Sequence, residues 1–499
     1  MTYAEAVQFL YGLRLFGAKF GLKNTLKLAA LAGHPQNRLR FIHVAGTNGK
    51  GSTCAMLESI YRAAGLRTGL FTSPHLVSFR ERIQINRQLI SETEVVRLVS
   101  ELRETSERRA PSRPDSTQHQ HAGTVPGAPM DRRDACPTFF EFVTVMALKF
   151  FAEQKCDLVI WETGLGGRLD ATNIVTPLAS VITNIALDHE QWLGDTLGKI
   201  AAEKAGIIKP GVPVITATDE PEALKVIEAI AMEKKALLIK SNFREGRRVH
   251  PPQCYGGRVA VPNQNQSGSP ARQPSQIEKL PLPGEHQRTN AALALSTVEV
   301  LQDKISVSDE TIRRGLSKVD WPGRLQLVQR PNGQKILLDG AHNVAGAKVL
   351  REALSSWSSI PPVAGLSGGT LKRGLQQAGP GIGAPQKFTL ILGVFEDKDW
   401  RHICETLAPL AARIFTVPVS SERSADAREL AAACRAANPT AGIAACGSLR
   451  EALEKTVADD FVVVTGSLYL VGEALELAGL SPATGGERAL NEWTATTSR

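Results

Sequence analysis

The segment at residues 41–53 limits the fold of this chain more than any other. It reads FIHVAGTNGKGST, so apolar residues typical of a strand run into a glycine-rich turn that contains Lys50 and two hydroxyl side chains. An amphipathic segment follows at residues 54–64 and ends at Gly65. This arrangement binds nucleotide phosphates, because backbone N–H groups and the helix N-terminus face the phosphates while the lysine neutralises their charge. The sequence therefore predicts an ATP site.

The loop departs from the usual phosphate-binding pattern in two places. Two residues, rather than four, lie between the first glycine and the Gly49–Lys50 pair, and Gly51 precedes Ser52. A glycine-rich surface turn is the alternative, but strand and helix signals on the correct sides favour a phosphate loop. The hydroxyls of Ser52 and Thr53 could contact Mg²⁺ or cap the following helix. We predict that the loop binds ATP through Thr47, Asn48, Gly49, Lys50, Gly51 and Ser52.

Length and cysteine pattern limit the class of protein. A chain of 499 residues is too long for one ordinary domain, so two or three domains are expected. No run of about 18 apolar residues is present, and the first residues lack the pattern of a secretion signal. The seven cysteines are odd in number and form no Cys-x-x-Cys pair, which argues against a disulfide framework or a structural zinc site. These features predict a cytoplasmic protein with no membrane partner.

The net charge of +8 raises the question of nucleic-acid binding. The arginines concentrate in irregular stretches such as residues 107–113 and 244–248. Aromatic residues make up only 5% of the chain and do not alternate with basic residues. We therefore attribute the charge to solvated loops and to a site for anionic substrates, and we expect no nucleic-acid partner.

Strand and helix patterns alternate along the chain in two series. The first series places helical patterns, such as those at 92–103 and 139–152, between strand patterns at residues 39–44, 68–72, 156–162, 179–185 and 213–217. The second, from about residue 303, has strand patterns at residues 335–338, 388–393, 413–417 and 461–465. Such alternation predicts an α/β fold with two doubly wound domains, the second one smaller. We place the domains at residues 1–302 and 303–499, with a linker at 302–309.

Three segments interrupt this alternation. Residues 107–136 and 251–276 are rich in polar residues and proline, and residues 355–386 are rich in glycine and proline. Structureless loops of this length are unusual inside compact domains, so we predict that these segments are mobile insertions.

Five further sequence blocks follow the phosphate loop. They read TSPHL at 72–76, ETGLGGRLDATN at 162–173, NIALDH at 184–189 with EKAGIIK at 203–209, WPGR at 321–324, and DGAHN at 339–343. Together with GTNGKGS at 46–52, and in this order, they resemble the blocks of folylpolyglutamate synthases and bifunctional dihydrofolate synthases in the Mur ligase superfamily. The resemblance implies a P-loop N-terminal domain similar to the Mur ligase central domain and a Rossmann-like C-terminal glutamate-ligase domain. The three insertions are not part of the family pattern.

The resemblance implies an ATP-dependent amide ligase. In that family, ATP phosphorylates a folate-type carboxylate to an acyl phosphate, and the amine of L-glutamate then displaces phosphate. The implied substrates are ATP, L-glutamate and either dihydropteroate or a reduced folate. Two Mg²⁺ ions are the implied cofactors, and family members are commonly monomers.

Two alternatives stay open at this point. A Mur-type peptidoglycan-precursor ligase shares the GTNGK loop and a block similar to DGAHN, although TSPHL favours the folate branch. A nucleic-acid-stimulated NTPase would share the loop alone. The carboxylate after the strand pattern at 156–161 is Glu162 rather than the usual aspartate, which argues against that second alternative.

The candidate metal ligands are Ser73, Glu162 and His189. Each follows an apolar strand pattern, and the ends of parallel strands meet at one edge of a sheet, where ligands bind. From the residues alone, His189 could instead be a hydrogen-bonding histidine, because imidazole is unusual for Mg²⁺. The resemblance implies that all three are magnesium ligands and that Lys204 is carbamylated, whereas the residues alone favour an exposed helix lysine. We predict catalytic roles for Lys50, His189 and Lys204.

The resemblance also implies two folate-binding segments. The predicted contacts are Phe139, Phe140, Glu141, Phe142, Leu169, Asp170 and Ala171. A flat ring stacks well on an aromatic side chain, but phenylalanines at helical spacing are as often core residues. The pair Gly21–Leu22 resembles a further loop near the pterin.

Three residues outside the phosphate loop match nucleotide contacts of the family: Asn290, Arg324 and Asp339. Arg324 offers a planar fork for phosphate, and Asp339 follows an apolar strand pattern at 336–338. If Arg324 and Asp339 reach ATP from the linker and the second domain, domain closure completes the site and excludes water. His342 could contact glutamate or cap a helix, and its role is left open.

Overall fold

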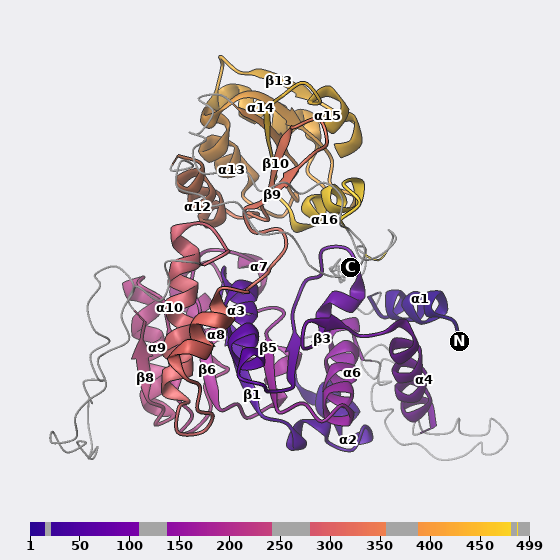
Figure 1. Ribbon diagram of the computed structural model, residues 1–499, viewed down its shortest axis with the longest axis vertical. Coiled ribbons are helices and arrows are strands. Elements are labelled where there is room, and N and C mark those ends of the chain that lie inside the picture. The colour runs from indigo at the N-terminus through magenta and orange to yellow at the C-terminus, as the bar shows by residue number, and fades with distance from the viewer. Residues whose placement is uncertain (15–20, 109–136, 242–279, 356–387, 481–486, 488–499) are drawn as a thin grey trace, which may run out of the picture.

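The computed structural model describes residues 1–14, 21–108, 137–241, 280–355, 388–480 and 487 (Figure 1). These residues form two α/β bodies, one built on an eight-stranded sheet and the other on a six-stranded sheet. In Figure 1 the body with the second sheet lies above the first. This architecture confirms the predicted fold class.

The first sheet has the strand order β4-β3-β2-β5-β1-β6-β7-β8. The six strands from β2 to β8 in this order run parallel, and β3 and β4 add an antiparallel edge. Neighbouring residues of a strand point to opposite faces, so Phe41 enters one core cluster while Ile42 and Val44 enter another. The strands are β1 (Phe41–Ala45), β2 (Thr68–Phe71), β3 (Ile83–Ile85), β4 (Gln88–Leu89), β5 (Leu158–Glu162), β6 (Ala179–Ile182), β7 (Val214–Thr216) and β8 (Leu238–Lys240).

Helices cover both faces of this sheet. The cluster that contains Phe41 packs under α1 (Tyr3–Leu13), α2 (Lys23–Leu31), α4 (Glu92–Arg108) and α6 (Phe139–Glu153). The cluster that contains Ile42 packs under α3 (Lys50–Ala63), α10 (Glu285–Val300) and α11 (Asp309–Leu316). A third cluster lies under α7 (Glu190–Leu193), α8 (Leu197–Ala205) and α9 (Pro221–Glu233). Short 3₁₀ turns are η2 (Pro35–Arg38), η3 (Phe79–Arg82) and η4 (Ala171–Ile174).

The second sheet has the order β13-β12-β11-β14-β10-β9 and is parallel except for β9. Its strands are β9 (Gln326–Gln329), β10 (Lys335–Leu338), β11 (Phe388–Leu392), β12 (Ala411–Thr416), β13 (Gly442–Ala445) and β14 (Phe461–Thr465). One core cluster lies under α12 (Val344–Ser355), α13 (Trp400–Leu407), η7 (Ala408–Leu410) and α14 (Ala427–Ala437). The other lies under α15 (Leu449–Lys455) and α16 (Leu468–Leu477). The sequence patterns did not predict β3, β4, β8, β9 or β13.

The join between the two bodies differs from the linker that we expected at 302–309. Ile305, Ile312 and Leu316 are buried in the cluster under α3, so α11 packs on the first sheet. The Ser59 hydroxyl donates to the Gly315 carbonyl at 2.7 Å and fixes this contact. The division at residue 302 stays a prediction, and the packing favours a boundary after Val319 instead.

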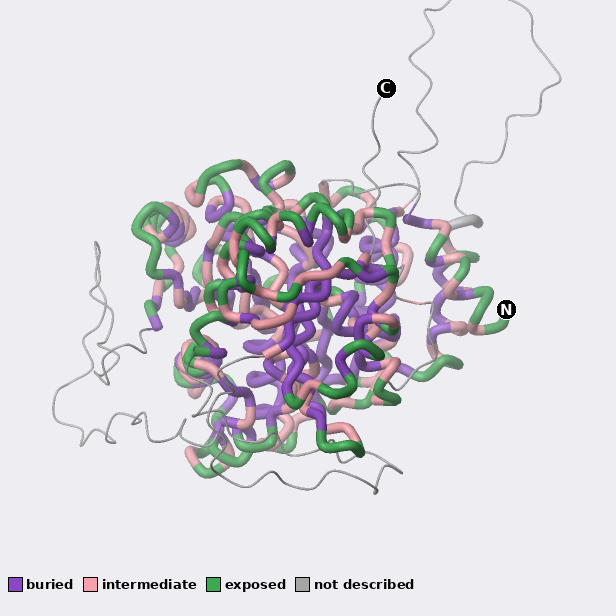
Figure 2. The backbone as a smooth tube through the Cα atoms, turned by 90° about the horizontal axis from the view of Figure 1, so that it is seen from above, coloured by how far each residue is buried: buried purple, intermediate pink, exposed green. Residues whose placement is uncertain are grey.

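The predicted insertions lie outside the described residues, apart from their first positions at 107–108 and 355. Seen from above, buried residues gather along the middle of the molecule and exposed ones form its rim (Figure 2). Among the helices that the structure describes, none has the length and apolar character needed to cross a membrane.

Candidate active site

A cleft of about 890 Å³ opens between the carboxyl ends of the first sheet and the facing edge of the second body. It is lined by all the residues that the sequence analysis assigned to ATP, metal or catalysis: Thr47, Asn48, Gly49, Lys50, Gly51, Ser52, Ser73, Glu162, His189, Lys204, Asn290, Arg324 and Asp339. These residues are spread over almost 300 positions of the sequence. The structure therefore brings them together, although their individual roles stay predictions.

The phosphate loop has the backbone that its glycines allow. Gly46 and Gly49 have φ values of 145° and 85°, which side-chain-bearing residues rarely adopt. Lys50 Nζ donates to the carbonyls of Gly46 and Thr47 at 2.9 and 3.0 Å, so its charge lies over the loop. The Asn48 N–H donates to Asn184 Oδ1 at 2.7 Å, which anchors the loop to the segment after β6.

The N-terminus of α3 has Gly49 as its N-cap and no side-chain cap. Ser52 and Thr53 therefore do not cap this helix, and that alternative is wrong. Ser52 Oγ instead accepts a hydrogen bond from Gln287 Nε2 at 3.2 Å. An uncapped helix N-terminus behind a glycine loop leaves backbone N–H groups free to face phosphate oxygens.

Glu162 and Ser73 are neighbours at the ends of β5 and β2. The Ser73 N–H donates to Glu162 Oε2 at 3.2 Å, and the Glu162 side chain is almost fully buried. Burial raises the pKa of Glu162 to about 7, against the opposing effect of Lys50. A buried carboxylate beside a phosphate loop is more stable when a cation lies next to it, and a hydroxyl and a carboxylate suit Mg²⁺ bound to a nucleotide.

His189 follows β6 of the same sheet, lines the same cleft and has a left-handed backbone conformation with φ of 53°. Burial lowers its pKa to about 3, so the ring is neutral. Its Nε2 lies 3.5 Å from Lys398 Nζ. The described residues contain no group of three or more His, Cys, Asp or Glu side chains placed to hold a metal ion. Magnesium binding by Ser73, Glu162 and His189 stays a prediction.

Lys204 is buried, which contradicts the exposed helix lysine that the residues alone favoured. Its side chain is 4% exposed, and Nζ donates to the Gly46 carbonyl at 2.9 Å. Burial, followed by repulsion from Lys50, lowers the pKa of Lys204 to about 7. A large fraction of this amine is therefore uncharged near neutral pH.

The second body supplies Arg324 and Asp339. The Asp339 carboxylate accepts backbone N–H groups of Leu325 and Ala341, both at 2.9 Å, so it shapes the loop that carries Arg324. Burial lowers the pKa of Arg324, while the charge of Asp339 opposes this shift. Both residues line the cleft. Asn290, on α10 of the first body, also lines it and lies directly beside Gly49 of the phosphate loop.

Sequence reasoning missed the contacts that cross the cleft. Lys398 Nζ donates to Asp188 Oδ1 at 2.6 Å, and both side chains are buried. Asn343 Nδ2 donates to Asp188 Oδ2 at 3.1 Å and to Asn48 Oδ1 at 3.0 Å, which links the second body to the phosphate loop. Asp188 and Asn343 lie inside the NIALDH and DGAHN blocks, so the blocks contained a signal for them. The segment after β11 gave none for Lys398.

The predicted folate contacts do not line this cleft. Phe142 is 1% exposed and its ring meets Phe9 edge-on at 5.4 Å, so it belongs to the core. The Glu141 side chain belongs to the capping box of α6. Asp170 accepts the N–H groups of Gly164 and Leu165 at 3.0 and 2.8 Å, which shapes a loop that does line the cleft.

The remaining folate candidates lie near that loop. The Phe140 ring lies against Gly164, and the Phe139 ring lies 5.3 Å from the Arg82 guanidinium. Leu169 is half-buried and Ala171 is buried. Folate binding by this group of residues stays a prediction.

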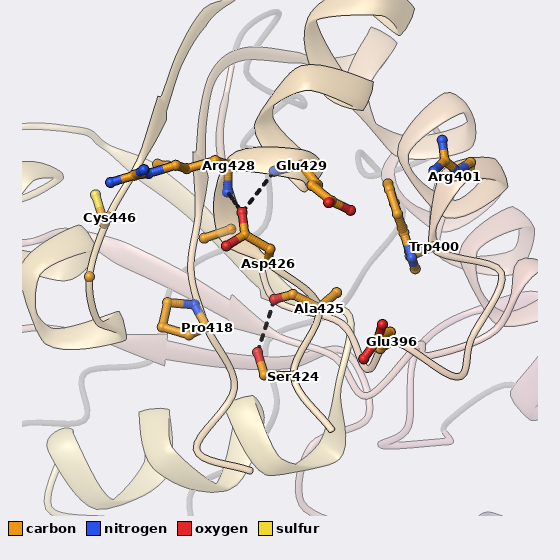
Figure 3. A pocket seen from close by; sticks show the side chains of 13 residues that line it. Glu396, Trp400, Arg401, Pro418, Ser424, Ala425, Asp426, Arg428, Glu429 and Cys446 are labelled. Atoms are coloured by element: carbon orange, nitrogen blue, oxygen red, sulfur yellow. Dashed lines mark hydrogen bonds between the residues drawn. The ribbon is translucent and has the colours of Figure 1, made fainter. Parts of the chain in front are cut away.

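The second body has a separate hollow of about 800 Å³ (Figure 3). Asp426 lies in it and caps α14 by accepting the N–H groups of Arg428 and Glu429. The Arg401 guanidinium lies 4.5 Å from the Trp400 ring. No residue that the sequence analysis selected lines this hollow, and its helix N-terminus is already capped, so the first cleft is the better candidate for the active site.

Comparisons with known proteins show what this chain is similar to. A family model described as "Mur ligase, glutamate ligase domain" matches residues 323–468. A Bacillus subtilis protein named dihydrofolate synthase/folylpolyglutamate synthase is 34% identical over 476 residues, which covers 95% of this chain and 98% of that relative. The solved structure of Escherichia coli FolC in complex with DHPP and ADP has a TM-score of 0.72 and 28% identity, and covers 96% of this chain and 98% of that one. A Mycobacterium tuberculosis folylpolyglutamate synthase complexed with ADP and AMPPCP has a TM-score of 0.74 and 26% identity, with coverage of 96% and 100%.

Proposed function

This chain belongs to the family of dihydrofolate synthases and folylpolyglutamate synthases and is an ATP-dependent ligase that adds L-glutamate to folates, and we propose that the cleft described above serves both tetrahydrofolate and dihydropteroate. The observation that carries the proposal is the convergence of the predicted ATP, metal and catalytic residues in that cleft. Relatives that match over nearly their whole length carry both names, which favours this function over a Mur-type peptidoglycan-precursor ligase.

The proposed reaction has two steps. A carboxylate oxygen of the folate attacks the γ-phosphorus of ATP, which gives an acyl phosphate and ADP. The amine of L-glutamate then attacks the acyl carbon, phosphate leaves, the amine loses a proton, and an amide remains. Both steps require the carboxylate and the phosphoryl group to be held in line and protected from water.

The residues of the cleft supply these conditions. Lys50 and the N-terminus of α3 offset the charge on the transferring phosphoryl group. Ser73, Glu162 and His189 would hold Mg²⁺, which supplies further charge neutralisation when bound. Asn290, Arg324 and Asp339 would complete the nucleotide site. The buried contact between Asp188 and Lys398 holds the two bodies together over the reacting groups and so limits the access of water.

We further propose that Lys204 is carbamylated and holds a second Mg²⁺. Its uncharged amine would add to CO₂ and lose a proton, which turns a cation into an anion with two oxygen donors. Burial of the amine and its lowered pKa support this chemistry. Monomeric state and a cytoplasmic location stay predictions.

The test uses the purified full-length protein with Mg-ATP, L-glutamate and either dihydropteroate or tetrahydrofolate. We expect phosphate release with both acceptors and products that are heavier by one glutamate residue in mass spectrometry. Turnover with tetrahydrofolate alone would restrict the enzyme to polyglutamylation. Failure of both acceptors to stimulate phosphate release would overturn the proposal.

A further inference from the structure

A residue near the C-terminus of the chain binds to the N-terminal body beside the cleft. Glu487 Oε2 accepts hydrogen bonds from Ser78 Oγ at 2.9 Å and from the Phe79 N–H at 2.7 Å. Glu487 Oε1 accepts one from the Tyr3 hydroxyl at 3.1 Å. Both carboxylate oxygens are thus bound by groups of the first body, at the start of η3 and on α1.

The backbone of the same residue begins a chain of hydrogen bonds that reaches the cleft. His75 Nε2 lies 2.9 Å from the Glu487 carbonyl oxygen, and Arg82 Nε lies 2.9 Å from His75 Nδ1. Arg82 then donates from a terminal nitrogen to Ser73 Oγ at 3.1 Å. Because a guanidinium can only donate and a carbonyl can only accept, this geometry requires His75 to carry its proton on Nε2.

The residues that form this chain are well fixed by their surroundings. His75 is 2% exposed and Arg82 is 3% exposed. Ser73 and Arg82 line the cleft, whereas Val77 is buried in a core cluster of the second body. The segment at residues 73–82 therefore lies between the two bodies, and Glu487 binds it through hydrogen bonds to His75, Ser78 and Phe79.

We propose that Glu487 is a positioning residue of the ligase: it holds the segment at residues 73–82 and, through His75 and Arg82, sets the direction of the Ser73 hydroxyl in the cleft. This inference rests on the proposed role of Ser73 as a magnesium ligand. Three donors bind the Glu487 carboxylate and hold this residue in place. The Glu487 backbone carbonyl is thereby held where His75 binds it, and the chain of hydrogen bonds to Ser73 starts there.

Protonation of Tyr3 supports the same geometry. Burial and the charge of Glu487 raise the pKa of the Tyr3 phenol. The hydroxyl therefore stays protonated and donates a hydrogen bond to the carboxylate. A hydrogen bond between a neutral donor and a charged acceptor is stronger than one between two neutral groups. The neutral side chain of glutamine could still accept from Ser78 and Phe79 in the same place, which separates the effect of position from that of charge.

The experiment compares Glu487→Ala and Glu487→Gln in the full-length chain, with Glu454→Ala on an exposed face of α15 as the control. The readouts are the Mg²⁺ concentration for half-maximal activity, KM and kcat for the folate acceptor, Tm, and hydrogen exchange at residues 73–82. Outer contacts of a metal ligand typically change affinity or activity by about 10-fold to 100-fold. We expect Glu487→Ala to raise the Mg²⁺ requirement by about 10-fold and to speed exchange at 73–82. Glu487→Gln should restore most of both, and Glu454→Ala should change neither.

A lower Tm for Glu487→Ala with an unchanged Mg²⁺ requirement would overturn the proposal, because it would show an anchor for the chain end alone. Equal hydrogen exchange at 73–82 in all variants would overturn it as well. The proposed function fails in a different way, through a wild-type protein that is inactive with both acceptors. In that case, calorimetric titration with Mg-ATP replaces the activity readout, and the affinity of Glu487→Ala relative to the wild type decides the question.

Discussion

The two sides of the cleft use their polar groups differently. On the first-sheet side, Lys50 donates to the carbonyls of its own loop, and Ser73 contacts the adjacent Glu162. On the other side, Lys398 and Asn343 cross to the first body. The contacts of the first side do not depend on the second body, so we infer that this side is arranged before the cleft closes and that the second side completes the site by closing it. Prearranged charge stabilises a transition state, whereas closure excludes water and brings the reactants together.

Breaking the contact across the cleft has the largest expected effect. Asp188→Asn leaves the buried Lys398 ammonium without its charged partner, and Lys398→Met leaves the buried Asp188 carboxylate without its charged partner. Removing one member of a buried pair typically costs about 3–5 kcal/mol. We expect this cost to appear as a loss in kcat/KM, because the pair holds the closed arrangement. The double variant should lose less than the sum of the two single variants.

The matched control is the pair Asp195–Lys199, which has a similar separation of 2.7 Å but is well exposed. An exposed pair contributes about 0–1 kcal/mol, so Asp195→Asn and Lys199→Met should leave kcat/KM nearly unchanged. Strictly additive losses for Asp188 and Lys398 would show that the two side chains act independently, and the closing role would have to be abandoned.

Removing the charge of the prearranged side comes next. We expect Lys50→Met to lower kcat about 10²-fold to 10³-fold, since one well-placed group that stabilises developing charge has about this effect. Lys225→Met on the outer face of α9 is the control. If KM for ATP rises while kcat is unchanged, Lys50 binds the ground state and the transition state equally, and the comparison between the two sides loses its basis.

The contrast also explains how far sequence could predict this molecule. The phosphate loop could be predicted because its glycines, its lysine and the flanking strand and helix are consecutive in the sequence. Glu162 could be selected because it ends an apolar strand pattern. Lys398 could not be predicted, because its role depends on its contact with Asp188, which lies 210 positions away in the sequence. Edge strands such as β4 and β13 are short and partly exposed, so their apolar patterns are weak. The position of α11 also depends on its packing against α3, and this contact cannot be predicted from the local sequence pattern.

A smaller effect tests where the first body ends. A Cβ added at Gly315 would lie 2.6 Å from Ile60 Cα, so Gly315→Ala pushes α11 away from α3. Overpacking of this kind typically costs about 1–3 kcal/mol, and we expect a lower Tm with normal activity at low temperature. Gly12→Ala adds the same methyl group where nothing lies within 4 Å, so it should leave Tm unchanged or raise it. An unchanged Tm for Gly315→Ala would place α11 outside the first body.

The smallest expected effect is the pH dependence that Lys204 contributes on the prearranged side. Its pKa falls from 10.5 to about 7 on folding, so between these values the unfolded chain binds a proton that the folded protein lacks. Stability should therefore rise with pH through this window, by at most about 1.4 kcal/mol per pH unit. Chemical denaturation of the wild type and of Lys204→Met, at pH 7 and pH 8 in CO₂-depleted buffer, measures the difference. Bicarbonate should then stabilise the wild type alone, because a carbamate forms only on the folded protein. Equal stabilisation of both proteins would mean that Lys204 remains a plain amine, and the first side of the cleft would then carry a neutral donor where we expect an anion.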